Sequence, residues 1–211
     1  MHIAVLGTGH MATTLAGGFL GAGHRVTFGS RQPDSHVDLA SPVVSTLDAI
    51  RDADLVVNAL QAAFTLDALT PLADALAGKI LLDIGNAVSP AFELLYPDVS
   101  LGERLQLALP RTRVIKSLNT LPGTLAVAPA SLSEPTDVFL SGDDADAKAL
   151  VGSLLADLGW SADRQIDLGG IATAKAAEHY FLLFVAMMQQ FRGRRSTSAS
   201  CGETTAVRRL R

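Results

Sequence analysis

Several residue types are scarce in this sequence, and each scarcity excludes a class of protein. The 211 residues include one cysteine, Cys201, so no internal disulfide can form and a reducing cytoplasm is the expected compartment. Aromatic residues make up 5% of the chain, too few for the stacking surfaces that bind single-stranded nucleic acid. The longest apolar run, residues 180–188, is too short to span a bilayer, and no signal peptide precedes the first predicted strand. We therefore expect a soluble intracellular protein that binds neither nucleic acid nor a membrane.

Charge and motif content exclude further classes. The formal net charge is −4, but residues 192–211 carry six arginines and one glutamate, so the preceding body has a charge of −9. A body this acidic is a poor general binder of polyanions, and any anion site must be local. The chain has no G-x-S-x-G nucleophile elbow and no Cys/His cluster with metal-ligand spacing, so we expect neither a serine hydrolase nor a metal site.

The residues that are present alternate between strand and helix patterns. Residues 2–6 form a short apolar run that stops at Gly7, residues 11–22 have apolar positions every three or four residues, and residues 24–28 form a second apolar run. This is one βαβ unit within 28 residues, with Gly23 ending its helix. Further strands are predicted at residues 54–60, 79–84, 113–118 and 136–140, and helices at 65–77 (broken near Pro71), 143–158 and 171–191.

This alternation predicts an α/β protein with a Rossmann-type, doubly wound, mostly parallel sheet and a short C-terminal helical extension. We expect a nucleotide-binding domain over residues 1–169, a C-terminal helix over 170–193 that contributes to an acceptor site and a dimer contact, and a disordered basic tail over 194–211. The second half of that helix, residues 180–188, is apolar on every face. It must be buried within its own chain or against a second subunit.

The first motif is a G-x-G-x-x-A turn, which reads Gly7-Thr8-Gly9-His10-Met11-Ala12. It follows a strand and opens a helix, which is the context that a dinucleotide-binding turn requires. Gly7 permits the tight turn, Gly9 lets the backbone approach a pyrophosphate, and Ala12 lets the helix pack closely on the strand. The helix N-terminus attracts the anion. The alternative is a glycine turn that binds no ligand.

The second motif indicates which dinucleotide binds. NAD-binding units place Asp or Glu at the end of the second strand, where it accepts a hydrogen bond from the ribose 2′-hydroxyl. Here that place reads Gly29-Ser30-Arg31. A hydroxyl and a guanidinium suit a 2′-phosphate, so the motif favours NADP(H) over NAD(H). The alternative is an exposed turn without ligand preference.

A third set of polar residues follows the later strands, where open α/β sheets bind their ligands. Asn86 and Asn119 could contact a ribose or a nicotinamide carboxamide, or could merely cap turns. Glu178 and His179 could approach a substrate, but a structural role on a helix surface is the more economical interpretation. We identify no catalytic acid–base pair, and hydride transfer from a cofactor requires none.

Several segments together resemble the NADP oxidoreductases that depend on the deazaflavin coenzyme F-420. The resemblance runs from Met1 to about Arg192, and it is carried by residues 3–9, 29–31, 116–121, 141–144, 166–174 and 178–179. It implies hydride exchange between NADPH and the deazaflavin, a small-molecule hydride acceptor. It also implies a homodimer joined through the C-terminal helical region.

The resemblance also implies roles for individual residues. The pyrophosphate would be held by Gly7, Thr8, Gly9, His10 and Met11, and the 2′-phosphate by Ser30 and Arg31. Leu60, Asn86 and Asn119 would border the nicotinamide. The family's usual apolar ending, of the kind Gly-Thr-Pro-x-Phe-Asn, is replaced here by a basic tail that begins at Gly193.

Two other readings stay open at this point. One is an NADPH-dependent reductase of a flavin, an imine or a small carbonyl compound. The other is a non-catalytic NADP(H) sensor that controls a partner protein. Acceptor pockets in this fold are built from variable loops, so the sequence does not choose among these acceptors.

Overall fold

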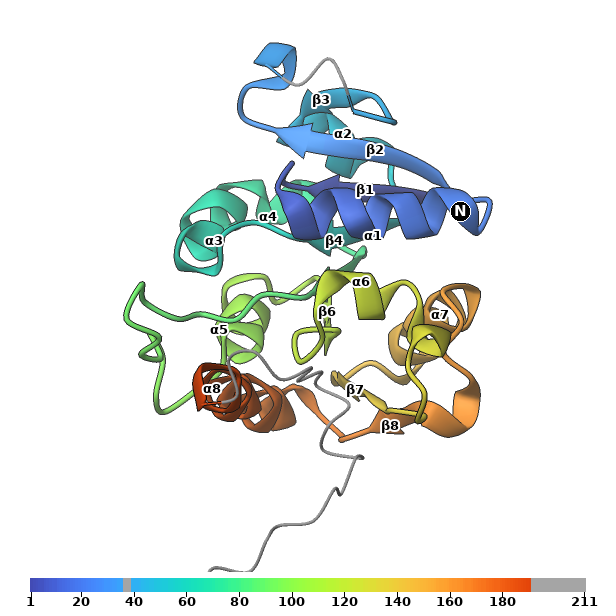
Figure 1. The fold of residues 1–211 in the computed structure, drawn as a ribbon. Helices are drawn as coiled ribbons and strands as arrows, with labels where there is room; N and C mark the ends of the chain where they lie inside the picture. The colour runs from blue at the N-terminus through green and yellow to red at the C-terminus, as the bar shows by residue number, and fades with distance from the viewer. Residues whose placement is uncertain (36–38, 191–211) are drawn as a thin grey trace, which may run out of the picture.

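The chain folds around one twisted sheet, shown in Figure 1. The computed structural model describes residues 1–35 and 39–190. The strand order is β3-β2-β1-β4-β5-β6-β7-β8. The strands are β1 (His2–Leu6), β2 (Arg25–Ser30), β3 (Val43–Ser45), β4 (Leu55–Asn58), β5 (Ile80–Asp83), β6 (Arg113–Ser117), β7 (Val138–Ser141) and β8 (Gln165–Asp167). Every neighbouring pair is parallel except β6 and β7, which are antiparallel. The predicted Rossmann-type, mostly parallel sheet is confirmed.

Helices cover both faces of the sheet. They are α1 (His10–Gly21), α2 (Thr46–Asp52), α3 (Ala62–Leu69), α4 (Ala73–Leu76), α5 (Leu101–Ala108), α6 (Gly123–Ala126), α7 (Ala145–Asp157) and α8 (Ala174–Gln190). One apolar core lies between the sheet and α1, α6 and α7. A second core lies between the opposite face and α2, α4, α5 and the start of α8, and Figure 1 shows α8 beside α5. The fold is therefore doubly wound.

The first helix forms where the apolar period predicted it. Leu15 and Phe19 recur on one face of α1 and are fully buried against the sheet. Gly23 follows the helix with φ +85°, a left-handed conformation that glycine adopts without strain, and its N–H donates to the Leu20 carbonyl oxygen. The predicted stop at Gly23 is confirmed.

Several boundaries differ from the prediction. The helix expected from residue 65 begins at Ala62, and Pro71 lies in a 3₁₀ turn (Thr70–Leu72) that separates α3 from α4. The prediction of a helix start at Asp143 is wrong, because Asp144 is the N-cap of α7 while the Asp143 carboxylate accepts from the Ile171 N–H. The segment predicted as one helix over residues 171–191 begins with a 3₁₀ turn, η5 (Ile171–Thr173), and continues as α8.

Five helices and strands were not predicted at all: β3, α2, α5, α6 and β8. The helix α5 carries a capping box, in which Ser100 and Glu103 satisfy each other's backbone N–H groups. That Ser-x-x-Glu spacing is visible in the sequence and could have located the helix. The strands β3 and β8 have three residues each, too few to establish a period of two.

Helix α8 has two unlike parts. Ala174, Ala177 and Glu178 are buried, whereas Leu183 and Met188 are 53% and 40% exposed. The expectation that residues 180–188 must be buried is therefore not met within this chain. By length and composition, residues Ile171–Gln190 form the one described helical stretch that could cross a membrane, and 22% of an apolar 18-residue window within it is buried. A single stretch of this kind is weak evidence, because a helix that packs against protein passes the same test.

The expected domain limits at residues 169 and 193 stay predictions. The tail over residues 194–211 and its Cys201 lie outside the described residues.

Candidate functional site

The predicted site residues follow five neighbouring parallel strands. They lie at or just beyond the carboxyl ends of β2 (Ser30 and Arg31), β1 (residues 7–11), β4 (Leu60), β5 (Asn86) and β6 (Asn119). Because these strands are parallel, their carboxyl ends lie at one edge of the sheet, which extends about 19 Å from β2 to β6 at about 4.8 Å per strand. The chain order reverses between β1 and β4, which is the switch point where such sheets bind ligands.

The glycine turn after β1 requires a glycine at position 7 for two reasons, its backbone conformation and a close neighbour. The φ of Gly7 is +106°, and the turn is fixed by a hydrogen bond from the Gly7 N–H to the Gly29 carbonyl oxygen at 3.0 Å. A Cβ atom at this position would lie 2.8 Å from the carbonyl oxygen of Ala59. Both the backbone conformation and the close approach of the chain leaving β4 therefore exclude a side chain.

Gly9 differs from Gly7, because nothing lies near its missing side chain. It is the N-cap of α1 with φ −77°, and a Cβ atom would meet no heavy atom within 4 Å. The helix start has no side-chain cap and no acidic residue in its first turn. The first N–H groups of a helix have no intrahelical partner and carry partial positive charge. The open space and these donors together fit an anion such as a pyrophosphate.

The other members of the turn have different environments. His10 is exposed, whereas Thr8 and Met11 are half-buried. A Cβ atom on Gly123 would lie 3.0 Å from the Met11 sulfur, so the Met11 side chain packs against the start of α6. Ala12 is buried and lets α1 lie close on the sheet, as predicted.

Ser30 and Arg31 lie at the carboxyl end of β2. The Ser30 hydroxyl oxygen accepts from the Gln32 N–H at 3.1 Å, so the hydroxyl hydrogen can still be donated. Arg31 is exposed, and no described carboxylate pairs with it. An unpaired guanidinium beside a hydroxyl suits a phosphate group.

Asn86 and Asn119 contact each other. The Asn86 Nδ2 donates to the Asn119 carbonyl oxygen at 2.7 Å, and the Asn119 Nδ2 donates to the Asn86 Oδ1 at 2.9 Å. Leu118, directly before Asn119, has φ +60°, a conformation that costs a branched residue about 1–2 kcal/mol. The pair locks the turns after β5 and β6 together, and it leaves one N–H on each amide and the Asn119 Oδ1 for other partners. Leu60 is half-buried after β4, where its N–H donates to the Asn58 Oδ1 at 3.4 Å.

Beside this edge lies a group of buried ionisable residues, here called the Lys116 cluster: Asp83, Lys116 and Glu178. The three side chains are at most 3% exposed. The Lys116 Nζ donates to the Asp83 Oδ2 and to the Glu178 Oε1, both at 2.8 Å, and also to the Gly85 carbonyl oxygen. All three N–H donors of the ammonium are therefore used.

The two carboxylates of the cluster also accept from neutral donors. The Asp83 Oδ1 accepts from the Asn58 Nδ2 at 2.7 Å and from the Gly85 N–H at 3.2 Å. Glu178 accepts from the N–H groups of Leu101 and Gly102 at the start of α5, at 3.0 and 3.3 Å. The cluster thus joins the end of β5, strand β6 and two helices.

Burial alone would lower the pKa of Lys116, but the charges and hydrogen bonds of Asp83 and Glu178 outweigh it and raise the pKa above its usual value. Lys116 therefore stays protonated and is no candidate for a proton donor or a nucleophile. Glu178 has the structural role that the sequence favoured, but it is buried against Lys116 and α5 and does not lie on an exposed helix surface. His179, its neighbour, is exposed. The available signal for the cluster was a charged residue, Asp83 or Lys116, directly after an apolar run in each of two predicted strands.

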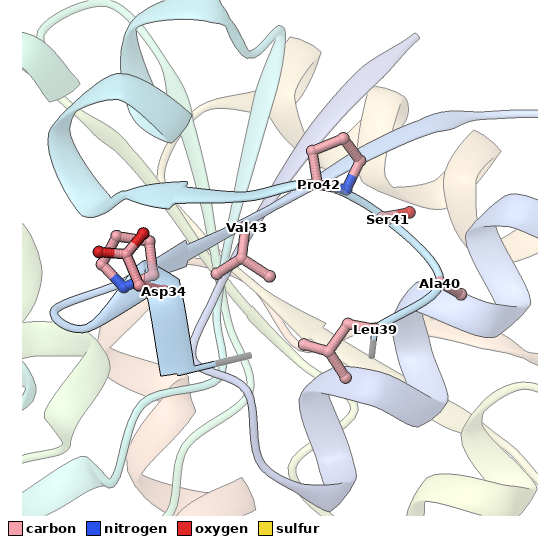
Figure 2. Close-up of a pocket in the computed structure, with 7 residues that line it drawn as sticks. Asp34, Leu39, Ala40, Ser41, Pro42 and Val43 are labelled. Atoms are coloured by element: carbon pink, nitrogen blue, oxygen red, sulfur yellow. The ribbon is translucent and has the colours of Figure 1, made fainter. Parts of the chain in front are cut away.

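Two cavities are lined by other residues. Figure 2 shows the first, of about 410 Å³, between the 3₁₀ turn η1 (Pro33–Ser35) and residues 39–43 at the β3 edge of the sheet. The second, of about 540 Å³, lies between α7 and β8. Neither is lined by a predicted site residue. Across residues 1–35 and 39–190, no three His, Cys, Asp or Glu side chains gather as a metal ion would require.

Comparison with known proteins adds independent information. A family model described as NADP oxidoreductase, coenzyme F-420-dependent, matches residues 2–87. The chain is 28% identical to the metalloreductase STEAP3 of Rattus norvegicus over 179 residues, which are 83% of this chain and 35% of that protein. It is 25% identical to the F-420-dependent NADP reductase of Methanocaldococcus jannaschii over 218 residues, covering 92% and 95% of the two chains. The chain thus spans about a third of the metalloreductase and almost all of the archaeal reductase.

Among solved structures, one from Arthrobacter sp. FB24 is similar over nearly its whole length. It is provisionally assigned as an F-420-dependent NADP reductase. The TM-score is 0.83 and the sequences are 37% identical, over 89% of this chain and 93% of that one.

Proposed function

Because the chain belongs to the family of NADP oxidoreductases that depend on coenzyme F-420, we propose that it transfers hydride between NADPH and a deazaflavin of the F-420 type. The observation that carries the proposal is the convergence of the glycine turn, the Ser30-Arg31 pair and the paired asparagines at one edge of the sheet. These are the parts that a pyrophosphate, a 2′-phosphate and a nicotinamide each require.

The residues present fit NADP(H). In this proposal, Gly7, Thr8, Gly9, His10 and Met11 hold the pyrophosphate, because Gly9 leaves open space in front of uncapped N–H groups. Ser30 and Arg31 bind the 2′-phosphate through charge-assisted hydrogen bonds. Leu60, Asn86 and Asn119 border the nicotinamide, the two amides through the polar atoms that their mutual pair leaves available.

When bound, NADPH supplies the hydride, and the protein supplies position. The predicted site residues do not include an acid–base pair. All three N–H donors of the Lys116 ammonium are used by its three acceptors. Reduction of a deazaflavin takes up a hydride from NADPH and one proton, and solvent can supply that proton after the transfer, so the hydride step itself requires no acid–base pair among these residues. The site residues would therefore act by holding two rings in contact and excluding water.

We further propose that the protein is a homodimer that covers the second part of α8. The Phe181 and Phe184 rings contact each other with centroids 6.3 Å apart, and with Met188, one turn further on, they lie along one side of α8 that this chain leaves half-covered. Monomers rarely expose such a continuous patch, and a second copy related by a two-fold axis is its commonest cover.

The test follows the absorbance of NADPH as each acceptor is added in turn. Rapid oxidation with F-420, and little with FMN or without an acceptor, is the expected result. Oxidation with FMN or an imine but not with F-420 would assign the same cofactor site to a different acceptor. NADPH binding without turnover of any acceptor would instead favour a sensor.

A further inference from the structure

The Lys116 cluster has more negative than positive charge. Within the described residues, every hydrogen bond of the Asp83 and Glu178 side-chain oxygens is accepted from a donor: the Lys116 ammonium, the Asn58 amide, or a backbone N–H of Gly85, Leu101 or Gly102. A protonated carboxyl group would need an acceptor in this shell, and none of these contacts provides one. Both carboxylates are therefore ionised, and with one ammonium the cluster carries a charge of −1.

This charge lies next to the turn that we assign to the nicotinamide. The Asp83 Oδ1 accepts from the Gly85 N–H, and the Lys116 ammonium donates to the Gly85 carbonyl oxygen, so the cluster holds both peptide groups that flank Gly85. Asn86 follows directly. Because the cluster is buried, its field is screened less by water and salt than that of a surface charge.

The two redox forms of the cofactor respond differently to such a field. The nicotinamide ring of NADP⁺ carries a positive charge, whereas the ring of NADPH is neutral. We propose that the net negative charge of the Lys116 cluster strengthens the binding of NADP⁺ relative to NADPH, and so sets the redox balance of the bound cofactor. This proposal rests on the proposed function, because it takes the nicotinamide to lie at Asn86.

Glu178→Gln removes one unit of charge while keeping the size of the side chain. For two unit charges separated by about 10 Å, Coulomb's law with an effective dielectric constant of about 20 to 40 corresponds to about a fourfold to twentyfold change in affinity. We therefore expect the ratio of the NADP⁺ Kd to the NADPH Kd to rise by about that factor in the variant. Both constants are measured by isothermal titration at equilibrium, without an acceptor.

Two controls separate charge from structure. Glu178→Asp keeps the charge but shortens the side chain, so it disturbs the contacts with Lys116 and α5 and should leave the ratio unchanged. Asp157→Asn removes the same charge from an exposed carboxylate that pairs with His24, far from the carboxyl edge, and should also leave the ratio unchanged. If Glu178→Gln does not fold, Asp83→Asn makes the same change of charge and carries the same expectation.

The outcomes are distinct. A ratio that rises in Glu178→Gln and in neither control supports the proposal. If Glu178→Gln and Glu178→Asp weaken both cofactors equally, the cluster is purely structural and the inference is wrong. A wild-type protein that binds neither NADP⁺ nor NADPH would instead remove the proposed function, and this inference with it.

Discussion

The two glycines of the first turn provide a matched pair of variants, because the structure gives them opposite surroundings. A Cβ on Gly9 meets nothing within 4 Å, and φ −77° suits a branched residue. Replacing glycine at a compatible position stabilises by about 0.4–1 kcal/mol through the unfolded chain. Gly9→Val should therefore fold normally, with a Tm within about 4 °C of wild type.

The same variant should lose its cofactor. The valine side chain would occupy the space in front of the α1 N-terminus and displace the pyrophosphate from its N–H donors. Each charge-assisted hydrogen bond contributes about 1.5–3 kcal/mol. The loss of two would weaken NADPH binding by about 10²- to 10⁴-fold. Fluorescence titration with NADPH, alongside a thermal melt, measures both quantities on one sample.

Gly7→Ala is the contrasting variant. Its left-handed backbone costs an alanine about 1–2 kcal/mol, and the 2.8 Å contact with the Ala59 oxygen adds about 1–3 kcal/mol of overpacking. At about 2–4 °C per kcal/mol, its Tm should fall by about 4–20 °C. The reasoning is refuted if Gly9→Val melts normally and binds NADPH within about threefold of wild type, because the turn is then not the phosphate site.

Three further predictions follow from other parts of the molecule. The wild type should bind NADPH at least about tenfold more tightly than NADH, and Arg31→Ala should abolish that preference; equal wild-type affinities by titration would contradict the assignment of Ser30 and Arg31. Light scattering should give about twice the 22.1 kDa of one chain, and Phe184→Asp with Met188→Asp should dissociate or precipitate the protein; a monomeric wild type at micromolar concentration would disprove the proposed interface. Lys116→Met should lower stability by about 3–5 kcal/mol, because two buried carboxylates lose their cation, and an unchanged Tm would show that the cluster is not ionised as described.

The fold was predictable from the sequence because its strongest signals are local. A fully apolar strand, a glycine stop and a helical period are each complete within about ten residues, and β1, α1 and β2 could be placed from them. The elements that were missed lack such signals. The strand β3 is defined by its pairing with β2, with Gly29 opposite Val44, and no pattern within three residues reveals that partner.

The site was predictable to the extent that it depends on backbone conformation. The roles of Gly7 and Gly9 depend on their having no side chain, and the residue type alone shows this in the sequence. The Lys116 cluster was not predicted, because its members are separated by 33 and 62 residues and their partnership depends on tertiary packing. The mutual pairing of Asn86 and Asn119 was missed for the same reason, since the sequence shows two amides but not that each satisfies the other.

Because all three N–H groups of the Lys116 ammonium are hydrogen-bonded inside the core, this lysine should react with acylating agents differently from the others. The chain has four lysines, and Lys79, Lys148 and Lys175 are only partly buried, whereas Lys116 is 1% exposed. Acylating agents attack the free amine, so they will modify the other three in the native protein and reach Lys116 only when the sheet opens. The rate at which Lys116 becomes acylated, followed by the mass of the peptide that contains it, therefore measures the rate at which the core opens.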